Sequence, residues 1–381
     1  MKLFSDLCVC VKDQCEPGKS GASVYVGLEH IDSGSFFLNR QGKPAEVQSS
    51  KTRFRKGDVL YGKLRPYLDK AVIAPADGIC STDILVFRPK AHCCATYLLG
   101  LIHTAEFRTH ADQTTNGVNH PRTSWHGLAV FPWNIPPKPE QEKIAATLWK
   151  IQRAIEVETK LIATARDLKQ SAMPQLFTEG LHNEPQKQTE IGPIPKSWSV
   201  KPFDAFVILQ RGQDLTRSDF QGGKVPVIGA TKVIGYHNVA NVKGPGVTVV
   251  RSGSSAGKPL YIEEDFWAHN VVLYVREFHG NIPLFAYYKL CSLQLEQFRS
   301  GVAVPTLNRN SFSSELIAIP LIEEQREIAD IVQTIDRKIS VHERKRAALS
   351  DLFQTLLHQL MTAQIRVDKL DIDTREISAL C

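Results

Sequence analysis

Long hydrophobic runs are missing from this 381-residue sequence. A membrane-spanning helix needs about 20 predominantly apolar residues, and no stretch approaches that length. Residues 1–7 are not followed by the apolar core that a secretory signal requires. These two absences predict a soluble, cytoplasmic protein with no membrane contact.

Cysteine is present but is not arranged for a structural metal. Cys8, Cys10 and Cys15 lie close together, whereas a structural zinc site needs four ligands, usually in paired clusters. No second cluster follows among the eight cysteines of the chain. We therefore expect reduced thiols, some of them buried, and no metal site.

Signatures of catalysis are also missing. No glycine-rich loop follows a predicted strand to hold a nucleotide cofactor, and the Asn/Asp-Pro-Pro-aromatic motif typical of amino-methyltransferases is absent. Residues 253–258 hint at a phosphate loop, but the spacing is incomplete and Pro259 stands where Ser or Thr is needed. The sequence thus predicts a non-catalytic protein without a cofactor, and at most a phosphate-contacting turn at 253–258.

Neither sign of charge is in large excess. Lys and Arg number 46 against 40 Asp and Glu, which gives a formal net charge of +6. This mildly basic balance is compatible with a nucleic-acid partner without requiring one. With 43% hydrophobic residues, the chain can bury the cores of two or three domains.

An internal repeat is present. Residues 139–145 read PEQEKIA and residues 323–329 read EEQREIA, and the same shift of 184 positions relates about forty residues without a gap. The regions before these segments repeat more weakly, and the strand-like alternation of each ends in an apolar run, at 83–87 and 271–275. The order along the chain is therefore arm, helix, arm, helix and a short tail.

The two helical segments carry apolar residues at heptad spacing. In the first segment, rows seven residues apart begin at Ile144 and Leu148, and the second segment repeats this pattern. An antiparallel pair that brings Ile144 to Leu360 joins the apolar rows. It also places Glu158 opposite Arg346, and a polar pair in a seam fixes the register. We predict an antiparallel coiled coil; the alternative is two separate amphipathic helices, each packed on its own arm.

Three motifs accompany the helical segments. Each helix opens with Glu-Gln-x-x-Ile-Ala, residues 173–181 read MPQLFTEGL, and residues 191–198 read IGPIPKSW before the second arm. With these motifs the chain resembles, over essentially its whole length, the specificity subunit of type I restriction–modification systems. The Pro-x-x-Trp motif of Pro195 and Trp198 has no counterpart before Met1. We expect the tail after Ala363 to pack against that short N-terminus.

The resemblance implies an α/β (α+β) fold. Two mixed target-recognition domains are joined by two long antiparallel coiled-coil helices, with a pseudo-two-fold internal repeat. The expected boundaries are 1–137 and 196–320 for the recognition domains, 138–180 and 321–363 for the spacer helices, 181–195 for a linker, and 364–381 for a C-terminal tail.

The resemblance also implies a DNA-binding subunit. It would read a bipartite asymmetric site in double-stranded DNA and direct adenine methylation and cleavage by its partners. The implied partners are two modification (adenine methyltransferase) subunits and restriction (translocase/endonuclease) subunits. A recognition subunit of a related type II system and a coiled-coil scaffold that binds other proteins are the alternatives.

Candidate DNA contacts lie in the arms. Phosphate positioning uses Lys, Arg, Ser and backbone N–H groups, and base reading uses Arg, Asn and Gln. The candidates of the first arm are Arg53, Lys63, Arg65, Tyr67, Lys70, Asn116, Asn119, His120 and Arg122. Those of the second arm are Arg211, Gln213, Arg251, Ser252, Ser254, Lys258, Arg299, Asn308 and Arg309. A shift of 188 positions aligns Lys63 with Arg251, and also Lys70 with Lys258, which favours these two pairs. The alternative for any single basic residue is a solvated surface charge.

Overall fold

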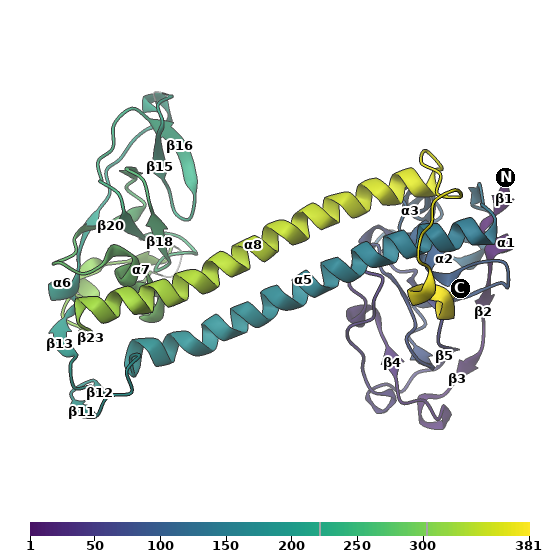
Figure 1. The fold of residues 1–381 in the computed structure, drawn as a ribbon, viewed down its shortest axis with the longest axis horizontal. Helices are drawn as coiled ribbons and strands as arrows, with labels where there is room; N and C mark the ends of the chain where they lie inside the picture. The colour runs from purple at the N-terminus through teal and green to yellow at the C-terminus, as the bar shows by residue number, and fades with distance from the viewer. Residues whose placement is uncertain (221, 302–303) are drawn as a thin grey trace. The chain divides into compact units, whose positions relative to one another are not determined.

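The computed structural model of the protein describes residues 1–220, 222–301 and 304–381. The chain forms two compact units. Unit 1 comprises Met1–Lys160 together with His342–Cys381, and unit 2 comprises Leu161–Val341. Each unit contains one arm of mixed helices and strands and a portion of each of two long helices (Figure 1).

The two long helices are α5, Lys138–Thr178, and α8, Ile322–Met361, with 41 and 40 residues. At about 1.5 Å per residue each is about 60 Å long. Helix α5 begins in unit 1 and ends in unit 2, whereas α8 begins in unit 2 and ends in unit 1, so the two run in opposite directions. The antiparallel pair predicted from the heptads is confirmed.

The apolar seam between these helices follows the predicted rows. In unit 1, Ile144 and Leu360 are buried in the same cluster of side chains. In unit 2, Leu176 and Ile328 share a second cluster. Each cluster also contains side chains of the arm of its unit, because the helices bury one apolar stripe against each other and another against the arm.

The polar pair in the seam differs from the prediction. The carboxylate of Glu158 is buried and lies 2.6 Å from both the His342 ring and the Lys345 ammonium group. The predicted pairing of Glu158 with Arg346 is therefore wrong. Heptad spacing identifies the face of a helix but not which side chain of the facing turn forms the pair. The Glu158 carboxylate pairs with the two donors within reach, His342 and Lys345, which are three residues apart on one side of α8.

The arm of unit 1 contains two four-stranded sheets. The first has the order β2-β9-β6-β7 and the second β3-β5-β8-β4. The strands of the first sheet are β2 (Cys8–Val11), β9 (Ile84–Pro89), β6 (Val59–Gly62) and β7 (Ala71–Ile73). Those of the second are β3 (Gln14–Cys15), β5 (Lys51–Phe54), β8 (Gly78–Cys80) and β4 (Tyr25–Val26). A short pair, β1 (Lys2–Leu3) with β10 (Pro132–Trp133), joins the two ends of the arm.

Four helices complete the arm of unit 1. They are α1 (Phe4–Leu7), α2 (Ala95–Ile102), α3 (Ala105–Gln113) and α4 (Trp125–Ala129). All eight residues of α2 are buried, which places this helix in the core of the unit.

The arm of unit 2 repeats the first sheet. It has the order β14-β20-β17-β18 beside a three-stranded sheet, β16-β15-β19. The strands of the larger sheet are β14 (Ile208–Arg211), β20 (Val272–Glu277), β17 (Gly246–Val250) and β18 (Pro259–Ile262). Those of the smaller sheet are β16 (Val233–His237), β15 (Val225–Ile228) and β19 (Trp267–Ala268).

Shorter elements surround these sheets. Three antiparallel pairs join β11 (Gln186–Thr189) to β12 (Gly192–Pro195), β13 (Ser199–Pro202) to β23 (Leu316–Ile319), and β21 (Arg299–Ser300) to β22 (Thr306–Leu307). The helices of the arm are α6 (Phe203–Phe206) and α7 (Pro283–Ser292). None of the helices in the described ranges combines the length and apolarity that a membrane crossing requires.

The Glu-Gln motif that revealed the repeat has a structural role. The Gln141 side chain accepts a hydrogen bond from the amide of Cys94, just before α2, at 3.1 Å, and donates to Pro136 at 2.9 Å. Gln325 makes the equivalent bond to Ile282 at 3.1 Å. A buried amide that satisfies backbone groups on both sides fixes the start of each long helix on its arm.

The glutamate of the motif has a different partner in each unit. In unit 2, buried Glu324 accepts a hydrogen bond of 2.7 Å from the Trp198 indole. In unit 1, buried Glu140 pairs with Arg366, with Nη2 2.7 Å from Oε2. Arg366 belongs to the C-terminal tail, so the tail supplies in unit 1 the donor that the Pro-x-x-Trp segment supplies in unit 2.

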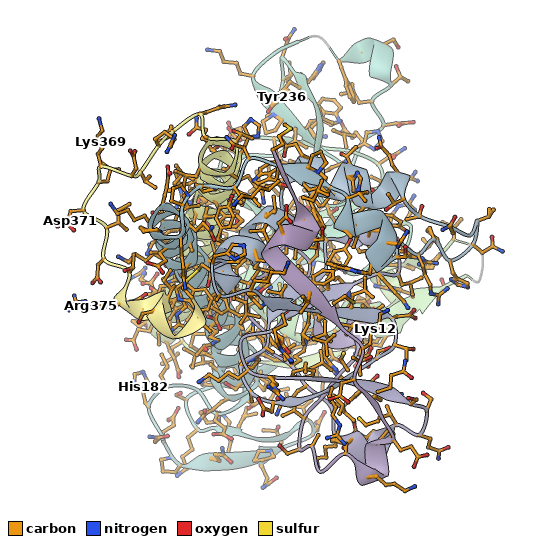
Figure 2. The ribbon with its side chains drawn as sticks, turned by 90° about the vertical axis from the view of Figure 1, so that its right-hand side faces the viewer. Lys12, His182, Tyr236, Lys369, Asp371 and Arg375 are labelled. Atoms are coloured by element: carbon orange, nitrogen blue, oxygen red, sulfur yellow. A yellow bond between two sulfur atoms is a disulfide. The ribbon has the colours of Figure 1, made fainter. Side chains whose placement is uncertain are left out.

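The tail packs on unit 1 along its length. Val367 and Ile377 are buried in the unit 1 cluster, and Lys143 donates to the carbonyl of Asp368 at 2.7 Å. The side chains of Lys369 and Asp371 point outward (Figure 2). These contacts anchor the tail to the beginning of α5 and to α2.

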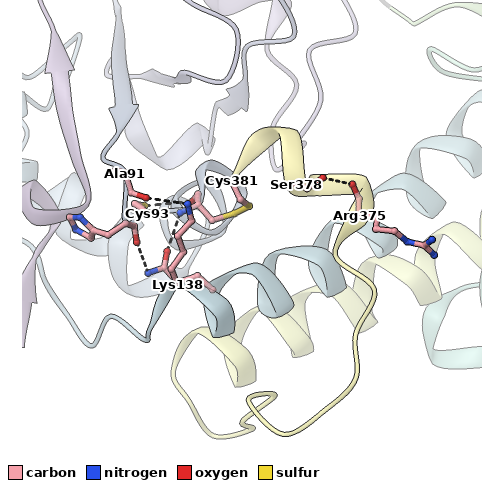
Figure 3. The surroundings of a disulfide bond; sticks show 9 residues. Ala91, Cys93, Lys138, Arg375, Ser378 and Cys381 are labelled. Atoms are coloured by element: carbon pink, nitrogen blue, oxygen red, sulfur yellow. Dashed lines mark hydrogen bonds between the residues drawn. A yellow bond between two sulfur atoms is a disulfide. The ribbon is translucent and has the colours of Figure 1, made fainter.

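A disulfide bond between Cys94 and Cys381 closes the tail onto the N-terminal end of α2 (Figure 3). Beside it, Lys138 donates to the carbonyl of Ala91 at 3.1 Å. The expectation that all thiols are reduced is wrong for this pair. The two cysteines are separated by 287 positions, and only the return of the tail brings them together. The other six cysteines are free.

Candidate nucleic-acid interface

A backbone crossing follows the end of β6 in unit 1. Lys63 comes directly after this strand; its amide donates to the carbonyl of Asp83 at 2.9 Å, and its carbonyl accepts from the amide of Thr123 at 3.1 Å. Both ends of the Lys63 peptide are therefore fixed, while the side chain is only half-buried. We call the Lys63 peptide, held by backbone hydrogen bonds between the segments that contain Asp83 and Thr123, the unit 1 crossing.

The same crossing follows the end of β17 in unit 2. The amide of Arg251 donates to Val271 at 2.8 Å, and its carbonyl accepts from Leu307 at 2.7 Å. The strand registers around the two crossings also match, since β6 pairs with β9 as β17 pairs with β20. Arg251 and Lys63 therefore occupy equivalent positions in the two arms.

A loop lies against each crossing. In unit 1 the amide of Arg65 donates to the carbonyl of Pro121 at 2.8 Å, and in unit 2 the amide of Gly253 donates to Pro305 at 2.9 Å. Both loops contain Gly-Val-x-x-Pro, at 117–121 and at 301–305. This motif is a further part of the internal repeat that was not recognised from the sequence, because the shift of 184 positions that relates the helices also relates the two loops.

Most of the first-arm candidates lie around the unit 1 crossing and its loop. They are Lys63, Arg65, Tyr67, Asn116, Asn119, His120 and Arg122. Bridges from Leu64 and Asn116 to the same residue, Arg122, hold the two segments together. Val118 at the loop tip is 98% exposed, so the tip projects amide and imidazole groups into solvent.

One cation at this surface has an internal partner. The Arg122 guanidinium donates to both oxygens of Asp83, at 2.8 and 3.2 Å. These hydrogen bonds raise the pKa of Arg122 and lower the pKa of Asp83. Arg122 is consequently held in one orientation beside Lys63.

Two first-arm candidates lie elsewhere in unit 1. Arg53 is on β5 in the other sheet and donates to the carbonyl of Ser20 at 2.8 Å. Lys70 donates to the carbonyl of Leu28 at 2.6 Å. The backbones of Lys70 and Lys258 match, because the Lys70 carbonyl accepts from the amide of Gly62 and the Lys258 carbonyl accepts from the amide of Val250. Their side chains differ, because Lys258 is exposed. The structure does not bring Arg53 or the Lys70 ammonium group to the loop surface.

Four arginines line one open groove in unit 2. Arg211 ends β14, Arg251 follows β17, Arg276 is on β20, and Arg309 begins a short 3-10 helix. The groove has a volume of about 800 Å³, and none of the described residues that line it is acidic. Three of these arginines were candidates. Arg276 was not among them, because it directly follows the apolar run at 271–275, where the sequence pattern predicts only a strand.

Hydrogen bonds to neutral acceptors orient three of the four side chains. Arg251 Nε donates to the carbonyl of Asn270 at 3.2 Å, and Arg309 Nη1 donates to that of Leu209 at 2.9 Å. Arg276 Nη1 lies 3.4 Å from the Gln210 side-chain oxygen. Desolvation by burial, together with the charge of Arg211, lowers the pKa of Arg251.

The turn at 253–258 uses its backbone donors internally. The amides of Gly253, Ala256, Gly257 and Lys258 all donate to carbonyls of unit 2. They are therefore not available to surround a phosphate as a phosphate loop would require. The side chains of Ser254 and Lys258 are exposed and remain available to an external anion.

The remaining second-arm candidates frame the groove. Arg299 Nε donates to the carbonyl of Ala256 at 2.6 Å, and the Asn308 side chain accepts from the amide of Asn310 at 3.1 Å as a helix cap. Ser252 bridges Thr306, and the Gln213 amide donates to Ala268 at 2.9 Å. The polar contacts found for these four residues thus position the loops of the arm.

Within residues 1–220, 222–301 and 304–381, no group of three or more His, Cys, Asp or Glu side chains is arranged to hold a metal ion.

A model of the type I restriction modification DNA specificity domain matches residues 19–166 and, a second time, residues 195–351. The chain belongs to this family. The two matches each cover most of one arm and much of the helix that follows it, in agreement with the internal repeat. The role of this type I DNA specificity protein is DNA recognition, and its family description names no catalytic activity.

Curated relatives agree with this assignment. The chain is 22% identical to a putative type I restriction enzyme MjaX specificity subunit of Methanocaldococcus jannaschii, over 89% of this chain and 86% of the relative. It is 30% identical to the EcoDI specificity subunit of Escherichia coli, but over only 34% of this chain and 30% of the relative.

Solved structures share the fold. The S subunit of a type I restriction–modification system from M. genitalium matches with a TM-score of 0.68 at 15% identity, over 94% of this chain and 95% of that one. A chain from a study of complex assembly in the type I system matches with a TM-score of 0.53 at 17% identity, over 95% and 97%. Two recognition arms with two long helices are therefore the common architecture.

Proposed function

We propose that each arm of this specificity protein reads one part of a bipartite, asymmetric site in double-stranded DNA. The observation that carries the proposal is the repeated crossing: Lys63 and Arg251 follow equivalent strands with the same backbone bonds, and each presents a cation beside an exposed loop. A positive charge at a fixed place next to exposed polar side chains suits a protein that binds phosphate and reads bases.

The candidate residues divide by chemistry. Lys63, Arg211, Arg251 and Arg309 are assigned to phosphate groups, because a cation on a fixed backbone can set the position of the duplex. Asn116, Asn119 and His120 are assigned to base edges, because amide and imidazole groups can both donate and accept. Residues 1–137 and 196–320 are the proposed recognition domains, with 181–195 as linker and 364–381 as tail.

The long helices are proposed as the spacer and as the docking region for other subunits. The spans 138–180 and 321–363 would hold the two recognition domains at a fixed separation, so that the half-sites are read at a fixed spacing. The partners proposed are two adenine methyltransferase subunits and the restriction subunits, which would supply the chemistry. The specificity protein itself then selects the DNA and catalyses nothing.

The test is sequencing of methylated bases in the host with and without this gene. The proposal predicts that a bipartite adenine-methylation motif disappears when the gene is deleted. An unchanged methylome, in a host where the chain is expressed and co-purifies with a methyltransferase subunit, would contradict it. A scaffold that binds other proteins would show no salt-dependent affinity for DNA in any assembly.

Substitution of the two crossing residues tests the site. Lys63→Gln and Arg251→Gln should each weaken DNA binding uniformly across sequences. Each should also lower the slope of log affinity against log salt by about 1, as loss of one phosphate contact does. Lys70→Gln is the matched control, because the Lys70 ammonium group is bonded to Leu28. Equal slopes for all three variants and the wild type would remove Lys63 and Arg251 from the interface.

A further inference from the structure

The groove of unit 2 concentrates like charges at one place. Arg211, Arg251, Arg276 and Arg309 line it together, and among the described residues none of the four forms an ion pair with a carboxylate. Four guanidinium groups around one cavity repel one another unless an anion lies between them. Their combined positive potential therefore makes the groove a favourable place for an anion.

We propose that this groove holds a phosphodiester group of the DNA backbone, with Arg276 as a direct contact, and that the arm of unit 1 has no equivalent clamp. The proposal rests on the proposed function and adds to it the ligand group, one further residue and an inequality between the arms. A phosphodiester fits because guanidinium groups bind phosphate oxygens through two parallel N–H donors.

The geometry leaves donors for such a group. Arg251 uses Nε, and Arg309 and Arg276 each use Nη1, to bond neutral acceptors of the arm. Those bonds fix the planes of the guanidinium groups, and each of these groups still has further N–H donors for an anion. A clamp whose side chains are already oriented loses less entropy when the anion binds.

The arm of unit 1 shows why a clamp is absent there. Arg88 is equivalent to Arg276, since it lies at the same place in β9 as Arg276 does in β20. Its guanidinium donates to both oxygens of buried Asp58, at 2.9 and 2.7 Å. In unit 2 the position of Asp58 is taken by Gly246, which has no side chain. Arg88 is therefore neutralised internally, and Arg276 is not.

The test compares Arg276→Gln with the wild type in the full-length chain. The probe is a labelled duplex that carries the methylation motif, and a random duplex of equal length serves as the second probe. Between about 50 and 200 mM salt, the wild type should lose about 3.5-fold more affinity than R276Q for both duplexes, because one phosphate contact contributes about 0.9 to the salt slope. Arg276→Lys, which keeps the charge, should retain the wild-type slope.

Arg326→Gln is the matched control, because Arg326 is exposed on the first turns of α8 in the same unit. Its salt slope should equal that of the wild type. Equal slopes for R276Q and R326Q would overturn the clamp. A R276Q variant with an unchanged slope but relaxed preference at one base pair would also overturn it, in favour of base reading.

Inorganic phosphate separates a nucleic-acid backbone from a free anion. If millimolar phosphate stabilises the wild type against heat but not R276Q, while the DNA salt slopes of the two coincide, the groove binds a free anion and the proposal is wrong. A wild-type protein with no salt-dependent DNA affinity, either alone or assembled with a methyltransferase subunit, would contradict the proposed function itself. A DNA-binding wild type with an unaffected R276Q contradicts only the clamp.

Discussion

The two arms share a backbone arrangement but differ in whether their arginines are paired with carboxylates of the same arm. In unit 1, Arg88 and Arg122 are each paired with an aspartate of the same arm. In unit 2, Arg276 is in the same place as Arg88, and Thr306 replaces Arg122. The crossing is therefore a scaffold whose backbone hydrogen bonds do not depend on the side chains that it carries. Two arms built on it can therefore present different surfaces to DNA.

The largest expected effect comes from removing the internal partner of Arg88. Asp58→Asn removes the carboxylate that accepts both Arg88 hydrogen bonds. Asp58 is buried but the Arg88 side chain is 34% exposed, so the loss should be about 2 to 3 kcal/mol, as for a hydrogen bond to a charged group. Chemical denaturation, followed by hydrogen exchange at β6 and β9, should show the loss confined to unit 1. Asp83→Asn is the control, because its pair with Arg122 is more exposed and should cost less than about 1 kcal/mol. Equal losses for the two variants would contradict the contrast between a buried and an exposed pair.

The second effect concerns a lysine in the core of unit 2. Lys289 on α7 corresponds to apolar Leu101 on α2, and burial lowers the pKa of Lys289 to about 8. The unfolded chain, with a lysine pKa of about 10.4, therefore holds more protons between these values, so the stability of unit 2 should rise with pH in that window.

Lys289→Met should remove this rise. Between pH 7 and 10 the wild type should gain about 2 kcal/mol relative to the variant, measured by denaturant unfolding at each pH. Leu101→Met in unit 1 is the matched change and should leave the pH dependence as it is. A wild type whose stability is flat from pH 8 to 10 would mean that Lys289 is solvated in the folded protein.

The third effect compares the partners of the two motif glutamates. Trp198→Phe removes the indole donor to buried Glu324 and should cost about 1 to 2 kcal/mol, the price of a buried acceptor left partly unsatisfied. Arg366→Gln should cost less than about 1 kcal/mol, because 56% of the Arg366 side chain is exposed and water can replace it. Thermal unfolding of both variants decides the order; a larger loss for R366Q would mean that the tail, rather than the Pro-x-x-Trp segment, is the stronger support.

The long helices and their antiparallel pairing could be predicted from the sequence, because heptad spacing is a local pattern that repeats over about forty residues. It also aligned Lys63 with Arg251. Arg276 could not be found in the same way, because it directly follows an apolar run, and its charge is unpaired only because Gly246, rather than an aspartate, stands at the position that corresponds to Asp58. The bonds of Arg366 to Glu140 and of Cys94 to Cys381 join positions more than 200 residues apart. Contacts between such distant positions leave no local pattern in the sequence, so they could not be predicted from it.

A methylome resolved by arm tests whether each arm reads one half of the DNA site. Residues 118–120 at the tip of the first loop would be replaced by Gly-Ser-Gly, and the host methylome compared with that of the wild type. One half of the bipartite motif should relax or change, while the other half and the spacing between the halves stay the same. A change in both halves, or an unchanged motif with normal levels of methylation, would contradict the assignment of one half-site to each arm.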